Sequence, residues 1–303
     1  MKMKNLDVLI QRCCDGKKMK VAVACPHGLD TLEAACRAKK ENIVDPVLVG
    51  DPGVISKLAL ENELELEGIE IVEAPDERSA SEISVKMVSS GSADLLMKGL
   101  VKTASLLKAV LNKEWGLRTG SLLSHLLLFE APLLGDKVIG LSDGGMNMYP
   151  DLGAKVKIIE NAVDCFHKLG EENPKIAVLA AVETVNPDMP CTIDAASLSQ
   201  MNRRGQITGC VVDGPFALDN AISAEAAAIK KIDSSVAGKA DMLLVPDIEA
   251  GNMLAKVVLY IARNRAAGVV LGARSPIVLT SRFDTMEVKL LSIALGAVLA
   301  KEQ

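Results

Sequence analysis

The stretch VAVACPHGLDTLEAACRAKKENIVDPVLV, residues 21–49, decides the fold class of this chain. It opens with a short apolar run at 21–25 and closes with another at 46–49, and such runs predict buried strands. Residues 29–40 between them predict a helix. A strand, a helix and a second strand in this order are typical of a βαβ unit, whose two strands lie parallel.

The same alternation continues toward the C-terminus. Further strands are predicted at 69–73, 93–97, 122–129, 137–141, 176–180, 209–212, 242–245, 268–271 and 277–280. Further helices are predicted at 54–61, 77–89, 150–169, 194–203, 222–232, 252–264 and 286–300, with Pro150 in the first turn of its helix. The chain is therefore expected to be an α/β protein with mostly parallel sheets.

The length of 303 residues is enough for two packed α/β domains or for one large domain, and two domains are expected. The first comprises residues 1–142 together with the C-terminal helix at 285–303, and the second comprises residues 143–284. No repeat or flexible linker separates them in the sequence, so we expect the two domains to share a cleft. Ligands of α/β proteins bind in such clefts, at the carboxyl ends of strands.

Composition limits the classes of protein to which this chain can belong. With 49% hydrophobic but only 2% aromatic residues, the core must consist of Ala, Val, Leu, Ile and Met. A net charge of -5 argues against a nucleic-acid partner, and no charge-free run reaches the ~18 residues that a membrane-spanning helix needs. The seven cysteines form no zinc-binding pattern, and their odd number predicts reduced thiols in a cytoplasmic protein without a metal site.

Two lysines and a threonine follow the predicted strand at 93–97. Lys98 ends that strand, and Lys102 and Thr103 begin a helix. Because a helix N-terminus offers free N–H groups and the positive end of the helix dipole, this turn predicts a site for phosphate or acyl phosphate. The alternative is that the lysines are solvated and Thr103 only caps the helix.

Ser281 and Arg282 follow the last predicted strand and precede the C-terminal helix. The planar guanidinium of Arg282 can bind a phosphoryl group or stabilise a developing oxyanion, although a surface arginine beside a capping serine is an equal alternative. Asp284 and Glu287 come next, at the spacing of a helix cap with Asp284 as the N-cap. Both carboxylates are also candidates for a general base.

Other polar residues follow strands of the predicted second domain. The candidates for lining the cleft are Asp143, Asn147, Glu183, Asn186 and Asp213. Asp213 precedes Gly-Pro, so it is as easily part of a turn as a base. Neither a GxGxxG motif nor a Walker A loop is present, and the sequence therefore does not support a nucleotide-binding function.

Six segments together resemble the phosphate acetyl/butyryltransferase family, and its butyryltransferase branch most closely. They are ADLLMKG (93–99), LSDGGMNMYPDLGAKVKIIENA (141–162), ETVNPDMPCTIDAASL (183–198), GQITGCVVDGPFALDNAIS (205–223), VAGKADMLLVPDIEAGNMLAK (236–256) and PIVLTSRFDTMEVKLLSIAL (276–295). The resemblance implies a fold similar to that of the isocitrate/isopropylmalate dehydrogenases, a homodimer or larger homo-oligomer, and reversible conversion of acyl-CoA and phosphate into acyl phosphate and CoA. Coenzyme A is then a substrate, and no cofactor is bound permanently.

The resemblance also implies roles for individual residues. Ser281 and Arg282 match the Ser-Arg pair of the family's active cleft, and Thr103 matches its strand-to-helix threonine, with Lys98 in the preceding turn. Acetyltransferases of the family often carry a cysteine in the segment matching 142–147, where this chain has two glycines, so a cysteine nucleophile is excluded there. The aspartate that follows Ser-Arg in acetyltransferases is not in register, which leaves the choice between Asp284 and Glu287 open.

A short acyl-CoA is the implied substrate, and butyryl-CoA is favoured. One alternative is an acetyltransferase that prefers acetyl-CoA. A second is a non-catalytic acyl-CoA sensor of the same fold, against which the retained Ser281 and Arg282 argue. A dehydrogenase of the related fold is the third, and the chain lacks a nucleotide fingerprint for it.

Overall fold

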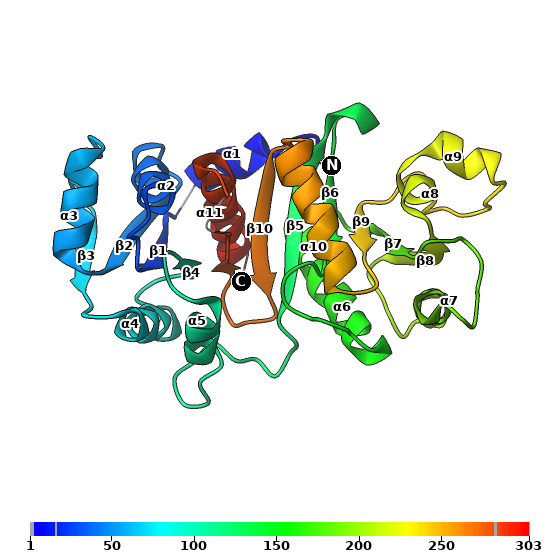
Figure 1. Ribbon diagram of the computed structural model, residues 1–303, viewed down its shortest axis with the longest axis horizontal. Coiled ribbons are helices and arrows are strands. Elements are labelled where there is room, and N and C mark those ends of the chain that lie inside the picture. The colour runs from blue at the N-terminus through cyan, green and yellow to red at the C-terminus, as the bar shows by residue number, and fades with distance from the viewer. Residues whose placement is uncertain (1–2, 16, 282–283, 303) are drawn as a thin grey trace. The chain divides into compact units, whose positions relative to one another are not determined.

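A computed structural model describes residues 3–15, 17–281 and 284–302 of the chain. The fold divides into two compact units, each of which we name after one of its residues. The Lys98 unit comprises Leu6–Ser121 and Ala266–Gln303, and the Asp143 unit comprises Met1–Asn5 and Leu122–Arg265. Both are α/β structures (Figure 1).

The Lys98 unit is built on six strands in the order β3-β2-β1-β4-β11-β10. Neighbouring strands are parallel, except that β10 and β11 are antiparallel. In chain order its elements are α1 (Asp7–Cys14), β1 (Met19–Ala24), α2 (Leu29–Lys40), β2 (Val44–Gly50), α3 (Pro52–Glu61), β3 (Glu70–Glu73), α4 (Glu77–Ser89), β4 (Leu95–Lys98), α5 (Thr103–Val110), β10 (Ala266–Leu271), β11 (Ile277–Val278) and α11 (Met286–Lys301).

Helices cover both faces of this sheet, with α1, α2 and α11 on one face and α4 and α5 on the other (Figure 1). The central strand β1 is fully buried from Val21 to Ala24, as expected for a parallel strand with helices on both sides. Helix α11 is buried along almost its whole length and contacts β10, α1 and α2. A helix that is apolar all round belongs in a core, and each buried Leu, Ile or Val stabilises the fold by roughly 1.5–3 kcal/mol.

The Asp143 unit has five strands in the order β5-β6-β9-β7-β8. Strands β5 and β6 are antiparallel, and the other neighbours are parallel. Its elements are β5 (Ser124–Ala131), the 3₁₀ turn η1 (Pro132–Leu134), β6 (Lys137–Ser142), α6 (Leu152–Lys168), β7 (Lys175–Leu179), α7 (Pro190–Arg203), β8 (Val211–Phe216), α8 (Leu218–Ile222), α9 (Ala224–Ile229), β9 (Met242–Leu244), α10 (Ile248–Lys256) and the π turn η2 (Val257–Ile261).

The mixed α/β class and the mostly parallel strands are confirmed, and the predicted strands and helices are present. Three helices differ in detail. Helix α6 begins at Leu152, so Pro150 lies before its first turn; the N-cap is Asp151, whose carboxylate accepts a hydrogen bond from the Ala154 amide at 2.7 Å. The helix predicted at 222–232 corresponds to the shorter α9, whose N-cap is extended Ser223, and it is preceded by α8, which was not predicted. The helix predicted at 252–264 begins earlier, as α10, and passes into a π turn.

The bounds of the two units also differ from the predicted domain boundaries at 142/143 and 284/285. Strands β5 and β6 pair with each other, and β6 pairs with β9, which places 122–142 in the Asp143 unit. Strand β11 pairs with β4, so the chain from Ala266 onward belongs to the Lys98 unit. No helix in the described part of the chain is long and apolar enough to cross a membrane.

Candidate functional site

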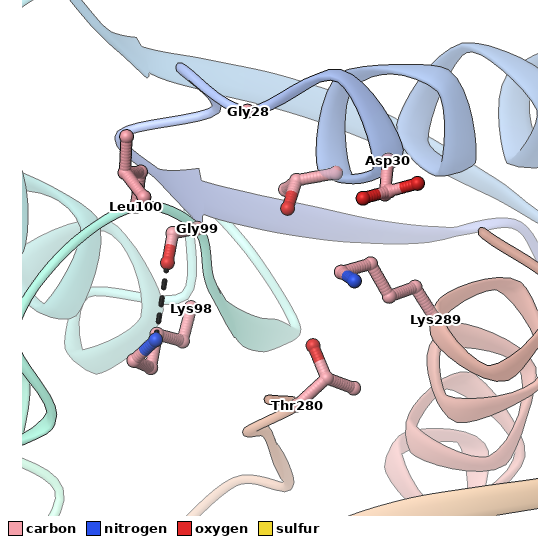
Figure 2. Close-up of a pocket in the computed structure, with 8 residues that line it drawn as sticks. Gly28, Asp30, Lys98, Gly99, Leu100, Thr280 and Lys289 are labelled. Carbon is pink, nitrogen blue, oxygen red and sulfur yellow. Dashed lines mark hydrogen bonds between the residues drawn. The ribbon is translucent and has the colours of Figure 1, made fainter. Parts of the chain in front are cut away.

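A small pocket lies in the Lys98 unit, where β1, β4 and β11 end side by side (Figure 2). Because these three strands are parallel, their carboxyl ends meet at one edge of the sheet, which is where α/β proteins bind ligands. The volume of the pocket is about 40 Å³, whereas roughly 10–15 Å³ is enough for one water molecule. Its lining residues are Gly28, Asp30, Thr31, Lys98, Gly99, Leu100, Thr280 and Lys289.

Lys98 is the last residue of β4 and is buried at the pocket. Its Nζ donates a hydrogen bond to the carbonyl oxygen of Gly99 at 3.2 Å. Since β4 is paired on both sides, the backbone that carries this ammonium group is fixed. The structure therefore places Lys98, a predicted phosphate ligand, at a strand end that can receive an anion.

A second lysine, Lys289, reaches the same pocket from the first turns of α11 (Figure 2). Only 2% of it is exposed, and its Nζ donates a hydrogen bond to the backbone oxygen of Asp284. Burial lowers the pKa of this ammonium group, while the carboxylates of Asp30 and Asp284 act in the opposite direction. Lys289 is not among the site residues predicted from the sequence, although a single lysine within the apolar run at 286–300 could have indicated it.

Thr280 follows β11 and directs its hydroxyl into the pocket (Figure 2). The residue is 5% exposed, and Oγ1 has no hydrogen-bond partner among the described residues. A buried hydroxyl without a partner costs about 1–3 kcal/mol relative to a satisfied one. The hydroxyl is therefore available to a bound ligand.

The N-terminus of α2 closes another side of the pocket. Its N-cap is Gly28, and no side chain accepts a hydrogen bond from the first turn. Helix N-termini attract anions through their unpaired N–H groups and the helix dipole. Asp30, in this first turn, is exposed and brings one negative charge to a pocket with two lysines.

Two of the predicted phosphate ligands, Lys102 and Thr103, begin α5 and are not among the residues lining the pocket. Lys102 is the N-cap and is exposed, and its backbone amide donates to Glu77 Oε2 at 3.3 Å. Thr103 is the first helical residue and is half-buried. It does not cap α5, because Lys102 occupies the N-cap position. Their assignment to phosphate stays a prediction.

The Ser-Arg segment lies directly after Thr280. The Ser281 amide donates to Asp284 Oδ2 at 2.7 Å, and the Asp284 amide donates to the carbonyl oxygen of Ser281 at 3.2 Å. Arg282 lies outside the described residues. The two hydrogen bonds bring Ser281 and Asp284 together beside the pocket.

The predicted cap of α11 is wrong by one residue. Thr285 is the N-cap, and its hydroxyl accepts from the Val288 amide at 3.3 Å, because the Asp284 carboxylate is engaged with Ser281. Glu287 is then the second helical residue and is exposed.

The remaining candidates belong to the Asp143 unit, where each holds its own loop. Buried Asp143 accepts from the amides of Gly145 and Met146 at 2.8 and 3.0 Å and from Asn147 Nδ2 at 2.6 Å. Asn147 also donates to the Leu123 carbonyl oxygen at 2.8 Å. These two side chains are brought together after β6 and fix the turn that carries Gly144 and Gly145.

The other three predicted cleft-lining residues also form local hydrogen bonds, namely Glu183, Asn186 and Asp213. Glu183 accepts from Lys230 Nζ at 2.9 Å, and this hydrogen bond lowers the pKa of the Glu183 carboxyl group. The Asn186 amide donates to Thr192 Oγ1 at 2.9 Å, and the Asp213 carboxylate accepts from Ser234 Oγ at 2.6 Å. Cleft-lining roles for these residues, and for Asp143 and Asn147, stay predictions.

Among residues 3–15, 17–281 and 284–302, no group of three His, Cys, Asp or Glu side chains could hold a metal ion. All seven cysteines are free thiols.

Comparison with known proteins decides the family. The family described as phosphate acetyl/butaryl transferase matches residues 76–297. The chain belongs to this family. Phosphate butyryltransferase of Clostridium acetobutylicum is 46% identical over 297 residues, which cover 98% of both chains. Phosphate acetyltransferase of Thermotoga maritima is also 46% identical and covers 94% of this chain and 96% of that protein.

Solved structures agree with the phosphate acetyl/butaryl transferase family. A branched-chain phosphotransacylase from Enterococcus faecalis has a TM-score of 0.82 at 32% identity and covers 93% of this chain and 99% of that one. A 4-hydroxythreonine-4-phosphate dehydrogenase from Burkholderia phymatum has a TM-score of 0.55 at 13% identity, covering 94% and 99%. The second likeness concerns the fold alone, and it confirms the predicted relation to a dehydrogenase-type fold.

Within this family, we expect the cysteines of this chain to be dispensable for turnover. Burial raises the pKa of Cys13, Cys25, Cys36 and Cys210 to about 11, and that of Cys165 to about 12, so these thiols stay protonated at neutral pH. A protonated thiol is a poor nucleophile.

Cys14 and Cys191 are the less buried thiols to test. The Cys14→Ala, Cys191→Ala double variant should keep most of the wild-type kcat in a free-thiol assay. Mass spectrometry of the protein during turnover provides the control. An acyl group covalently attached to any cysteine would contradict the expectation.

Proposed function

We propose that this protein transfers a short acyl group between coenzyme A and inorganic phosphate, interconverting acyl-CoA plus phosphate with acyl phosphate plus CoA. The observation that carries the proposal is the pocket of the Lys98 unit. Two buried lysines line this pocket, together with the Thr280 hydroxyl, which has no hydrogen-bond partner among the described residues. Thr280 directly precedes Ser281, and the chain belongs to the phosphate acetyl/butaryl transferase family. Ammonium groups and hydroxyl donors are suited to a phosphate.

The proposed chemistry is direct transfer with both substrates bound, which supplies proximity. The thiolate of CoA attacks the carbonyl carbon of the acyl phosphate, the new C–S bond forms, and the C–O bond to phosphate breaks with its electron pair leaving on phosphate. Asp284 or Glu287 accepts the thiol proton. Lys98 binds the phosphate. Lys102 and Thr103, which lie at the start of α5, are proposed to bind the same phosphate.

Ser281 and Arg282 complete the proposed mechanism. Ser281 donates a hydrogen bond to the phosphate, and Arg282 offsets the charge that develops on the tetrahedral oxyanion and on the departing phosphate. The two hydrogen bonds between Ser281 and Asp284 keep the carboxylate next to the serine that contacts phosphate. This arrangement favours Asp284 over exposed Glu287 as the proton acceptor.

Butyryl is the proposed acyl group, and acetyl is the alternative. Two relatives named phosphate butyryltransferase are 46% and 48% identical and one named phosphate acetyltransferase is 46% identical, so overall identity separates the two activities only slightly. The butyryl choice rests on the six sequence segments that resemble the butyryltransferase branch. A homo-oligomer and a cytoplasmic location are part of the same proposal, with CoA as a substrate.

The test is release of free CoA thiol from butyryl-CoA in the presence of phosphate, with acetyl-CoA and propionyl-CoA as parallel substrates. We expect phosphate-dependent release, fastest with butyryl-CoA. A reaction without phosphate controls for simple thioester hydrolysis. If folded protein releases no thiol from any C2–C5 acyl-CoA, the transferase proposal is wrong and the acyl-CoA sensor takes its place.

A further inference from the structure

We propose that Lys289 and Thr280, together with Lys98 and the N-terminus of α2, form the subsite that binds inorganic phosphate. The inference rests on the proposed function and adds to it two ligands that come from the C-terminal part of the chain. The pocket is small, and the groups that reach it are two ammonium groups, a hydroxyl and a helix N-terminus without a side-chain cap. Each of these favours an anion.

Lys289 is the first reason for placing an anion here. An ammonium group has three N–H donors. Among the described residues, Nζ of Lys289 donates one hydrogen bond, to the Asp284 carbonyl oxygen, and no carboxylate is close enough to form an ion pair with it. Asp30 and Asp284 act on this charge without forming an ion pair with it, and burying a cation without a directly paired anion is unfavourable. A phosphate in the pocket would supply a direct counter-ion and further acceptors.

Thr280 is the second and independent reason. Its hydroxyl is buried, points into the pocket and has no partner among the described residues. Valine has nearly the same shape, so packing alone does not require a hydroxyl at this position. A phosphate oxygen at the centre of the pocket would accept the hydrogen bond that the protein does not satisfy.

Charged groups at the pocket indicate the class of ligand. Lys98 and Lys289 bring two positive charges to it, and Asp30 brings one negative charge. We assign the pocket to free phosphate. The phosphate groups of CoA share the same chemistry, and the experiment below distinguishes the two sources.

The experiment measures the binding of inorganic phosphate in the absence of acyl-CoA, so that no turnover occurs. Binding is detected as the rise in the melting temperature of the protein that phosphate causes. The variants are Lys289→Met, which keeps the apolar stem, and Thr280→Val, which keeps the shape. Lys113→Met is the matched control, because this lysine is exposed, does not line the pocket and has no assigned role in phosphate binding. Desulfo-CoA, which lacks the reacting thiol, replaces phosphate in a parallel series.

We expect Lys289→Met to weaken phosphate binding roughly tenfold or more and Thr280→Val to weaken it somewhat less, since hydrogen bonds to charged groups are the stronger ones. Thr280→Val should at the same time raise the melting temperature of the free protein by ~2–4 °C, because it removes an unsatisfied buried hydroxyl. Lys113→Met should change neither. In turnover, both pocket variants should raise the KM for phosphate and leave the KM for acyl-CoA unchanged.

The outcomes separate this inference from the proposed function. If wild-type protein binds phosphate and releases thiol, but both pocket variants bind phosphate normally, the subsite is wrong and the transferase stands. If the variants lose desulfo-CoA binding and keep phosphate binding, the pocket binds a phosphate of CoA and our choice of ligand is wrong. If wild-type protein neither binds phosphate nor releases thiol, both proposals fail.

Discussion

An Arg282→Ala variant is expected to lose about 10²–10³ in kcat, since removing one preorganised donor to a developing charge costs roughly 2.7–4 kcal/mol. The charge that Arg282 faces in the proposed mechanism is largest while phosphate enters or leaves, so its contact should strengthen toward the transition state. Arg282→Lys keeps the charge but loses the planar fork of donors, and should recover only part of the loss.

The measurement is steady-state kinetics of thiol release, together with the melting temperature of each variant. Lys102→Ala is the control, and we expect its effect on kcat to be much milder. The fall in kcat for Arg282→Ala should be large while its melting temperature stays close to that of the wild type. If only the KM for phosphate rises and kcat is nearly normal, Arg282 is a uniform binding group without a transition-state role.

A Gly99→Ala variant is expected to lose both stability and turnover. A Cβ at Gly99 would lie 2.6 Å from the Ala24 carbonyl oxygen and 2.7 Å from the Cys25 carbonyl carbon, and these backbone atoms cannot rotate away. The end of β4 would have to move away from β1. That movement breaks the hydrogen bonds from the amides of Gly99 and Leu100 to the carbonyl oxygens of Ala24 and Cys25, which are 2.8 and 2.7 Å long.

Overpacking typically costs about 1–3 kcal/mol, and a clash with backbone should reach the upper end of that range. The melting temperature should then fall by several degrees. Lys98 is the neighbouring residue, so its ammonium group shifts with the strand end, and a displacement of about 1 Å can cost 10²-fold in rate. Gly28→Ala is the matched control, because it lines the same pocket and a Cβ there meets nothing within 4 Å. Equal melting temperatures for the two variants would refute the steric argument.

The backbone of this protein was largely predictable from its sequence because strand and helix signals are local. Residues 29–40 and 77–89 are helices with the predicted bounds, and the strands after them were found from apolar runs alone. The predictions erred where a single residue changes the local geometry. Ser223 lies inside the helix predicted at 222–232, but it is extended and caps α9 by accepting a hydrogen bond from the Ala226 amide. No propensity argument distinguishes it from an interior serine.

The site was only partly predictable because it depends on which strand ends are neighbours. Lys98 could be selected as the polar residue at the end of a buried strand. Lys289 lies on a helix, and its place at the pocket follows from the packing of α11 against α2, which no sequence spacing encodes.

The way in which the pocket is assembled has a consequence for the order of folding. Lys98 and the start of α2 come from the first third of the chain, whereas Thr280 and Lys289 come from its last tenth. During synthesis, β4 has β1 on one side but must wait for β11 on the other, while the 144 residues of Leu122–Arg265 can already form their own contacts. A nascent chain halted before residue 277 would therefore expose the free edge of β4 and could not bind phosphate through these lysines. The ability to bind phosphate would arise only near the end of translation, when the last strand and helix close the sheet of the Lys98 unit.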